Sequence, residues 1–88
     1  MKANKDSVKR LLKTAKGQID GMLKMIDEDK YCIEISTQIL ATIAILKRVN
    51  IDILDAHLHH CVMEADTKEE KEIKMDEISL ILKKAIKG

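Results

Sequence analysis

Apolar side chains recur every three or four positions along the first third of the chain, which is the spacing of one face of an α-helix. The series comprises Val8, Leu11, Leu12, Ala15, Ile19, Met22, Leu23 and Ile26. This pattern predicts a helix from about Asp6 to about Asp27. Asp6 or Ser7 is the expected N-cap, because its side-chain oxygen can accept a hydrogen bond from the first free backbone N–H groups.

The second periodic segment is unusually long. It follows the charged connection DEDK at residues 27–30, begins at Tyr31 or Cys32 and continues through His57 to Cys61 or slightly beyond. The chain has no proline, and its only glycines are at positions 17, 21 and 88, so nothing interrupts the segment. The pattern predicts a helix of about 33 residues and roughly 50 Å. A domain of this size does not need such a helix, which is therefore expected to project into a partner.

A third, shorter amphipathic helix is predicted after a polar turn at residues 66–68. Its apolar positions are Met75, Ile78, Leu82, Ala85 and Ile86, and it ends at Gly88. Phe and Trp are absent and Tyr occurs once, so the apolar residues are mainly those that suit helix-on-helix packing. We expect one all-α domain, residues 1–88, with three helices of which the central one is long. A chain of 88 residues buries a thin core, which favours oligomerisation.

The N-terminal stretch MKANKDSVKRLL is charged and contains no apolar run of signal-peptide or membrane-span length. A cytoplasmic location without a membrane partner is therefore expected. In a reducing compartment the two cysteines are expected to be thiols. The formal net charge is only +1, but basic residues concentrate in residues 2–16 and acidic residues in residues 64–77. One end of the chain is thus suited to meet an anion.

The stretch HLHHC at residues 57–61 forms, together with Cys32, a candidate metal site. At 100° per residue, Cys32, His57 and Cys61 fall within about 40° of one another. His59 points to nearly the opposite side and His60 to the flank. In one unbroken helix Cys32 would lie about 37 Å from His57. The three residues therefore cannot form one site within a single chain.

Two copies of the central helix, packed antiparallel across a two-fold axis, would bring the three residues together. Cys32 of one chain would then meet His57 and Cys61 of the other, and the symmetry would create two equivalent sites. The pairing is centred near Ile45, where Ala41 and Ala44 would let the backbones approach closely. A homodimer is required if the metal site exists.

The donor atoms indicate which metal such a site would prefer. Two thiolates and one imidazole are soft ligands suited to Cu(I) or Zn(II). Three ligands favour trigonal Cu(I), because structural zinc takes four. His60 could be a fourth ligand if the helix were distorted, which leaves Zn, Ni or Co open. The spacing alone favours, over a metal site, cysteines that are ordinary core residues and histidines that cap the helix or lie at the surface.

A row of lysines lines one face of the first helix beside its apolar stripe: Lys2, Lys5, Lys9, Lys13 and Lys16. Such a row is most often a solvated face, but it can also pair with nucleic-acid phosphates. No helix-turn-helix pattern is evident, so recognition by a helix inserted into the major groove is not expected.

Five short motifs occur in the order GQIDG (17–21), YC (31–32), TQI (37–39), KRVN (47–50) and HLHHC (57–61). In these motifs, and over nearly the whole chain, the sequence resembles the CsoR/RcnR family of metal-sensing repressors. Cys32, followed by His at +25 and Cys at +29, resembles the ligand set of the copper-sensing subgroup. Members that sense nickel or cobalt usually add an N-terminal histidine, and here no histidine precedes His57.

The resemblance implies further roles for named residues. Tyr31 and Glu77 match positions that hold the non-ligating nitrogen of the liganding histidine in copper sensors, which would fix its tautomer. The family assembles as an antiparallel four-helix-bundle dimer and then as a dimer of dimers, a homotetramer. Its DNA contacts come from basic residues of the first two helices. Arg48 in KRVN matches one of these positions, and the candidates on the first helix are Lys9, Arg10, Lys13 and Lys16. The family's usual arginine six residues before the first glycine is Leu11 in this sequence, with Arg10 one place earlier.

The function that follows is a Cu(I)-responsive transcriptional repressor, which binds operator DNA when metal-free and releases it when Cu(I) binds. One alternative is a thiol- or persulfide-responsive repressor that joins Cys32 and Cys61 of facing chains. Others are a Ni-, Co- or Zn-responsive sensor and a copper-buffering protein without DNA function. An enzyme is not expected, because no general acid or base lies beside the candidate ligands.

Overall fold

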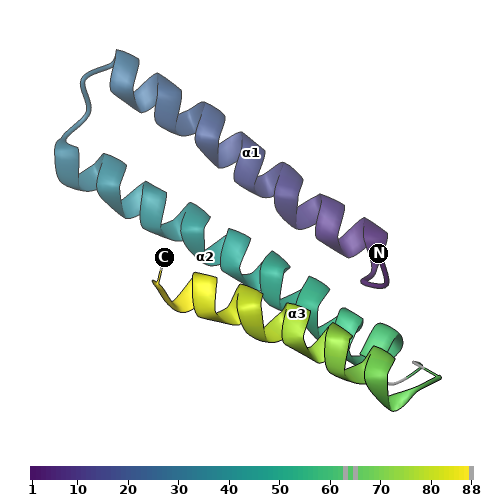
Figure 1. Ribbon diagram of the computed structural model, residues 1–88. Coiled ribbons are helices and arrows are strands. Elements are labelled where there is room, and N and C mark those ends of the chain that lie inside the picture. Colours follow the sequence, from purple (N-terminus) through teal and green to yellow (C-terminus); the bar gives the residue numbers. More distant parts are fainter. Residues whose placement is uncertain (63, 65, 88) are drawn as a thin grey trace. The chain divides into compact units, whose positions relative to one another are not determined.

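The described residues form four helical segments, which Figure 1 shows in order along the sequence. They are α1 (Lys5–Asp27), α2 (Cys32–His57), the π-helix η1 (Leu58–Val62) and α3 (Lys68–Lys87). This computed structural model describes residues 1–62, 64 and 66–87, and for residues 61, 62, 86 and 87 it describes the backbone but not the side chain. The described residues contain no strand. The prediction of an all-α fold with three helices and a long central one is confirmed.

By internal packing the chain divides into two compact units, residues 4–51 and residues 1–3 with 52–88. The first unit contains α1 and most of α2. The second contains the end of α2, η1 and α3. No helix among the described residues combines the length and the apolar character that crossing a bilayer requires.

The ends of α1 are closed by local hydrogen bonds. The N-cap is Asn4, whose side-chain oxygen accepts from the backbone N–H of Ser7 at 3.0 Å. The prediction of Asp6 or Ser7 as the N-cap was wrong, because the helix begins earlier and both residues lie inside it. At the other end the N–H of Lys30 donates to the carbonyl of Met25 and the N–H of Asp29 to that of Ile26. This is the Schellman arrangement, and Asp29 takes the left-handed conformation it requires, with φ of 52°.

In the unit 4–51, α1 and α2 run antiparallel, joined by the short connection at residues 28–31 (Figure 1). The side chains that the two helices shield best are Val8 and Ala15 on α1 and Thr42 and Val49 on α2. Thr42 is the one polar member, and its hydroxyl donates to the side-chain oxygen of Gln18 at 2.6 Å. The core is thin, as expected for a chain of this length.

In the other unit α3 packs against η1. The start of α3 is fixed by Thr67, whose hydroxyl oxygen accepts from the N–H of Glu70 at 3.1 Å. The Glu70 carboxylate in turn accepts from the N–H of Asp66 at 3.2 Å. This reciprocal pattern resembles a capping box and explains why the polar turn at 66–68 leads into a helix.

The central helix differs from its prediction. We expected one α-helix to reach Cys61 or slightly beyond, but α2 ends at His57 and the chain continues as the π-helix Leu58–Val62. A π-helix closes its hydrogen bonds over five residues instead of four, and such segments are frequent at functional sites. The angle of 100° per residue that placed His57 and Cys61 on one face therefore does not apply beyond His57.

Candidate metal centre and nucleic-acid interface

Cys32 is the first residue of α2 and its thiol is free and exposed. Tyr31 precedes it and caps the helix through its backbone, since its carbonyl accepts from the N–H groups of Glu34 and Ile35. The phenol of Tyr31 is exposed, with 70% of the residue surface accessible. Because a helix N-terminus carries a partial positive charge, this position favours an anionic ligand such as a metal-bound thiolate.

His57 is the last residue of α2, and its side chain faces α3. Its Nε2 lies 3.8 Å from Oε2 of Glu77, a separation that suits an ion pair and is longer than a hydrogen bond. The His57 side chain is 30% exposed and that of Glu77 60%. Both residues line a pocket of about 350 Å³, whose other walls are Met1, Lys2, Ile53, Leu54, Ile78 and Ile81. With Nε2 turned toward Glu77, Nδ1 is the ring nitrogen left for a metal.

The other two histidines have carboxylate neighbours of their own. Nδ1 of His59 lies 3.9 Å from Oδ1 of Asp55, and Nδ1 of His60 lies 3.9 Å from Oε1 of Glu64. All three histidines thus lie beside acidic side chains. For His59 and His60 the sequence already shows an acidic residue four positions away. The prediction of the metal site, which considered only thiol and imidazole donors, missed them.

The predicted ligands are divided between the two compact units of the chain. Cys32 belongs to the unit 4–51 and His57 to the other unit, while the side chain of Cys61 lies outside the described residues. Among the side chains that are described, no three of the His, Cys, Asp and Glu type gather to hold a metal ion. The chemistry of the donor set nonetheless fits a soft metal, because thiolate and imidazole are the ligands that Cu(I) and Zn(II) prefer.

One flank of the α1–α2 pair is apolar and exposed to solvent in the single chain. We call this the apolar flank; at 100° per residue its members lie on one side of the contact between the two helices. Their exposed fractions range from 40% to 58%. The members are Leu12, Ile19, Leu23 and Ile26 of α1 and Ile39, Ile43 and Leu46 of α2. Cys32 falls on the same side of α2 by the same count.

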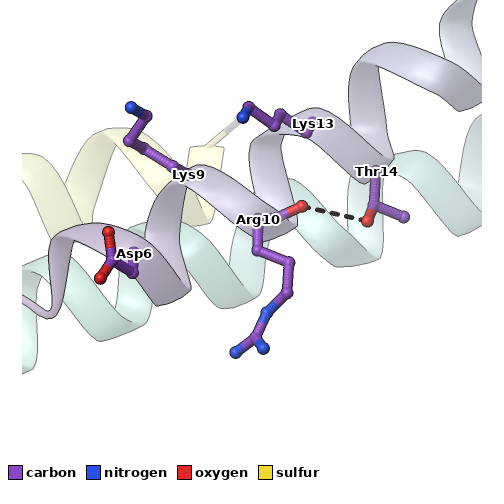
Figure 2. Close-up of a pocket in the computed structure, with 5 residues that line it drawn as sticks. All are labelled: Asp6, Lys9, Arg10, Lys13 and Thr14. Carbon is purple, nitrogen blue, oxygen red and sulfur yellow. Dashed lines mark hydrogen bonds between the residues drawn. The ribbon is translucent and has the colours of Figure 1, made fainter.

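The basic residues of α1 surround a shallow groove, shown in Figure 2. It has a volume of about 470 Å³ and is lined by Asp6, Lys9, Arg10, Lys13 and Thr14. Lys9 and Lys13 extend to one side of the helix and Arg10 to the other (Figure 2). A second hollow of about 240 Å³ is lined by Lys9, Leu12, Lys13 and Lys16.

The predicted DNA-binding side chains have accessible charged groups. Lys9, Arg10, Lys13, Lys16 and Arg48 are all exposed. Within the described part of the chain none of them forms an ion pair. Such a surface can pair with phosphates without first breaking internal salt bridges.

An all-helical chain with thiol and imidazole donors on α2 and a basic surface on α1 has the features of a metal-responsive DNA-binding protein. Comparison with known proteins identifies the family. The model of the family described as "Metal-sensitive transcriptional repressor" matches residues 4–84. The chain therefore belongs to the family of metal-sensitive transcriptional repressors, as the resemblance to CsoR/RcnR proteins predicted.

Three relatives illustrate the match. The copper-sensing transcriptional repressor RicR of Mycobacterium tuberculosis is 46% identical over 61 residues, which are 69% of this chain and 64% of RicR. The copper-sensing transcriptional repressor CsoR of Bacillus subtilis is 36% identical over 84 residues, which are 96% of this chain and 83% of that protein. Among solved structures, the copper-sensing repressor CsoR with Cu(I) from Geobacillus thermodenitrificans NG80-2 superposes with a TM-score of 0.84 at 32% identity. That likeness covers 92% of this chain and 84% of the other.

Proposed function

We propose that this protein is a Cu(I)-responsive transcriptional repressor, which binds operator DNA when metal-free and releases it when Cu(I) binds to Cys32, His57 and Cys61. The observation that carries the proposal is the placement of His57, whose Nε2 faces Glu77 and leaves Nδ1 for a metal. An orienting carboxylate beside a liganding imidazole is typical of metal centres. The relatives named as copper sensors support the choice of metal.

The site lies between two chains in this proposal. The apolar flank supports a homodimer, because seven large apolar side chains on one side of a helix pair exceed what a small monomer usually exposes. Two α1–α2 pairs that meet at this flank would form an antiparallel four-helix bundle. Cys32 lies on the same flank, so each chain would offer its thiol to His57 and Cys61 of the other.

Cu(I) would supply a soft Lewis acid that joins two thiolates and one imidazole across the dimer. The protein's own contribution is to orient these ligands. Tyr31 stands beside Cys32 at the start of α2, and in the dimer its phenol would approach the imidazole of the facing chain. The π-helix η1 is a helix distortion of the kind that would let His60 join as a fourth ligand. A four-ligand site would favour Zn, Ni or Co instead.

The DNA-binding surface is the basic face of α1 together with Arg48 of α2. Lys9, Arg10, Lys13 and Lys16 are exposed and unpaired by described carboxylates, and a homotetramer would present four such faces. If Cu(I) lowers the affinity of the repressor for DNA by a certain factor, linkage requires that DNA lower the affinity of the repressor for Cu(I) by the same factor. That coupling is typically about 1 to 3 kcal/mol. We further propose a cytoplasmic protein in which residues 1–88 act as one domain and no reaction is catalysed.

The test is an anaerobic titration of the apoprotein with Cu(I) while the binding of fluorescent operator DNA is followed by anisotropy. We expect salt-sensitive DNA binding that is lost at one Cu(I) per chain, and loss of this response in Cys32→Ala, His57→Ala and Cys61→Ala variants. His59→Ala is the matched control, since His59 lies next to the site but pairs with Asp55. X-ray absorption of the Cu(I) complex should show two sulfurs and one nitrogen.

Three results would overturn parts of the proposal. Release of DNA by sulfur donors but not by Cu(I) would indicate a persulfide-responsive repressor. Release by Ni, Co or Zn alone, with a response that depends on His60, would indicate a sensor of those metals. Tight Cu(I) binding without salt-sensitive, sequence-selective DNA binding would indicate a copper-buffering protein.

A further inference from the structure

Two motifs noted in the sequence, GQIDG and TQI, take no part in the proposed metal site or the basic groove. Their glutamines, Gln18 and Gln38, lie instead on the contact face between α1 and α2, where both are partly shielded from solvent. The hydroxyl of Thr42, a buried side chain that is only 4% exposed, lies near the side-chain oxygen of Gln18 and the backbone carbonyl oxygen of Gln38. The contact face therefore contains a polar side-chain pair, Gln18 with Thr42, that neither the metal site nor the basic groove uses.

The contact face follows a seven-residue repeat. The shielded positions of α1 from residue 8 onward are 8, 11, 15, 18, 22 and 25, and those of α2 up to residue 51 are 35, 38, 42, 45 and 49. Every other residue from 9 to 51 is exposed. Both series alternate steps of three and four, which is the spacing of a coiled-coil seam. The helices are thus packed along a regular seam, with Gln18 and Thr42 at core positions of it.

The hydrogen bond between Gln18 and Thr42 places these two residues at the same level of the antiparallel pair. Counting outward from it, each shielded residue of one helix meets a shielded residue of the other. The matched layers are Leu11 with Val49, Ala15 with Ile45, Gln18 with Thr42, Met22 with Gln38 and Met25 with Ile35. The observed hydrogen bond and the burial pattern therefore specify the same register.

Apolar layers alone define such a register weakly, because one methyl-rich layer can replace another. A polar pair at a core position defines it more strongly, since a slip would take the Thr42 hydroxyl away from the Gln18 side chain and leave it only its bond to the carbonyl oxygen of Gln38 on the same helix. The hydroxyl of Thr42 lies 2.6 Å from Oε1 of Gln18 and 3.2 Å from the carbonyl oxygen of Gln38. A slip by one heptad would move Gln18 opposite Ile35 or Val49, where neither side chain offers a hydrogen bond.

The register decides where two arginines lie. Arg10 precedes Leu11 and Arg48 precedes Val49, so both belong to the same layer of the seam. At 100° per residue Arg10 lies on one side of the α1 contact face, and Arg48 lies on the side of α2 that adjoins it in an antiparallel pair. Their levels along the axis differ by about two residues, roughly 3 Å. This arginine flank, Arg10 with Arg48, is on the side opposite the apolar flank.

We propose that the Gln18–Thr42 hydrogen bond is a positioning contact for DNA binding. It fixes the axial register of α1 against α2 and so holds Arg10 and Arg48 side by side as one phosphate-binding surface. A slip of one heptad would separate the two guanidinium groups by about 10 Å along the axis. This inference rests on the proposed function as a DNA-binding repressor, and it assigns Arg10 to a joint surface with Arg48.

The test compares Thr42→Val, which removes the hydroxyl at nearly constant shape, with Thr42→Ser, which keeps it. The matched control is Thr37→Val, because Thr37 lies on the exposed side of α2 and its hydroxyl bonds only to the carbonyl of Ile33 at 2.7 Å. Operator affinity is measured for each full-length protein over a range of salt concentrations. Circular dichroism and the Cu(I) stoichiometry establish the folded, active fraction.

We expect Thr42→Val to lose at least about tenfold in operator affinity and to show a salt slope smaller by about one or more, because fewer phosphates are contacted together. Thr42→Ser and Thr37→Val should stay within about threefold of the wild type. A merely structural contact would lower the active fraction and leave the salt slope unchanged. Wild-type slope and affinity in Thr42→Val would overturn the inference.

If Thr42→Val does not fold, the double variant Gln18→Leu/Thr42→Val decides the question, because it replaces the polar layer with an apolar one. We expect it to fold and yet to bind operator DNA weakly with a reduced salt slope. Wild-type binding by this variant would overturn the inference. Absence of salt-sensitive DNA binding in the wild-type protein would overturn the proposed function, and this inference with it.

Discussion

Removing the Glu77 carboxylate should disconnect copper binding from DNA release while leaving the fold intact. If Cu(I) binds Nδ1 of His57, as we propose, the ring proton is held on Nε2, and that N–H would point at the Glu77 carboxylate, which lies 3.8 Å away. The contact would then be stronger in the metal-bound state than in the free state. Only such a differential interaction can shift the equilibrium between a DNA-binding and a released form.

The size of the effect follows from the exposure of the pair. Because Glu77 is 60% and His57 30% exposed, solvent screens their attraction in the free protein, and pairs of this kind contribute about 0.2 to 1 kcal/mol. Glu77→Ala should thus lower the free energy of unfolding by no more than about 1 kcal/mol. Loss of an orienting partner should weaken Cu(I) binding by about 10- to 100-fold. The coupling to DNA, about 5- to 150-fold in typical systems, should fall to within a few-fold of unity.

The assay measures Cu(I) affinity by competition with a chromophoric chelator, and DNA affinity by anisotropy with and without saturating Cu(I). Glu77→Gln separates charge from hydrogen bonding, since the amide oxygen can still accept but carries no charge. Glu72→Ala is the matched control, because Glu72 is an exposed acidic residue of the same helix. If Glu77→Ala bound Cu(I) more weakly but still released DNA as fully as the wild type at saturation, Glu77 would not couple the two sites.

Three further variants test the rest of the structure. Asp29→Gly should raise the free energy of unfolding by about 0.5 to 1 kcal/mol, since glycine adopts the φ of 52° without strain; chemical denaturation that shows a loss would contradict the Schellman assignment. Asn4→Ala should cost about 1 kcal/mol by the same measurement, because the N-cap bond to Ser7 is lost. Ile43→Asp should weaken self-association at least about 100-fold in sedimentation experiments, because it buries an unpaired charge. The control Leu40→Asp, at a 64% exposed position off the apolar flank, should associate normally.

The periodicity of the apolar residues predicted the helices, but it did not show which apolar residues of α2 face α1 and which remain exposed. The sequence shows one apolar series in this segment, including Ile35, Ile39, Ile43 and Val49. In the structure Ile35 and Val49 face α1, whereas Ile39 and Ile43 remain exposed on the apolar flank. A hydropathy pattern indicates which side chains are expected to be buried. It does not show whether the same chain or a second copy buries them.

The polar features of the fold escaped prediction for related reasons. Gln18 and Thr42 occupy seam positions but are hydrophilic, so a search for apolar spacing passes over them. The π-helix at 58–62 has no signature in residue type, because its sequence LHHCV also suits an α-helix. The placement of Cys32, His57 and Cys61 as ligands came from spacing and family resemblance, and it stays a prediction.

The two flanks of the α1–α2 pair constrain how copper could release DNA. In the proposed dimer the second copy covers the apolar flank, which also carries Cys32, while Arg10 and Arg48 lie on the opposite side of the seam. In this arrangement a metal at Cys32 would not compete with phosphates for the same surface, so simple occlusion would not explain release. The proposed effect would pass through the geometry of α2, because this helix contains Cys32 at its start, Arg48 within it and His57 at its end. His57 is also the residue where α-helix gives way to π-helix and where α3 meets α2 through Glu77. In the proposed mechanism, a change at that junction, rather than at the DNA surface, is the step that Cu(I) would favour when the repressor releases DNA.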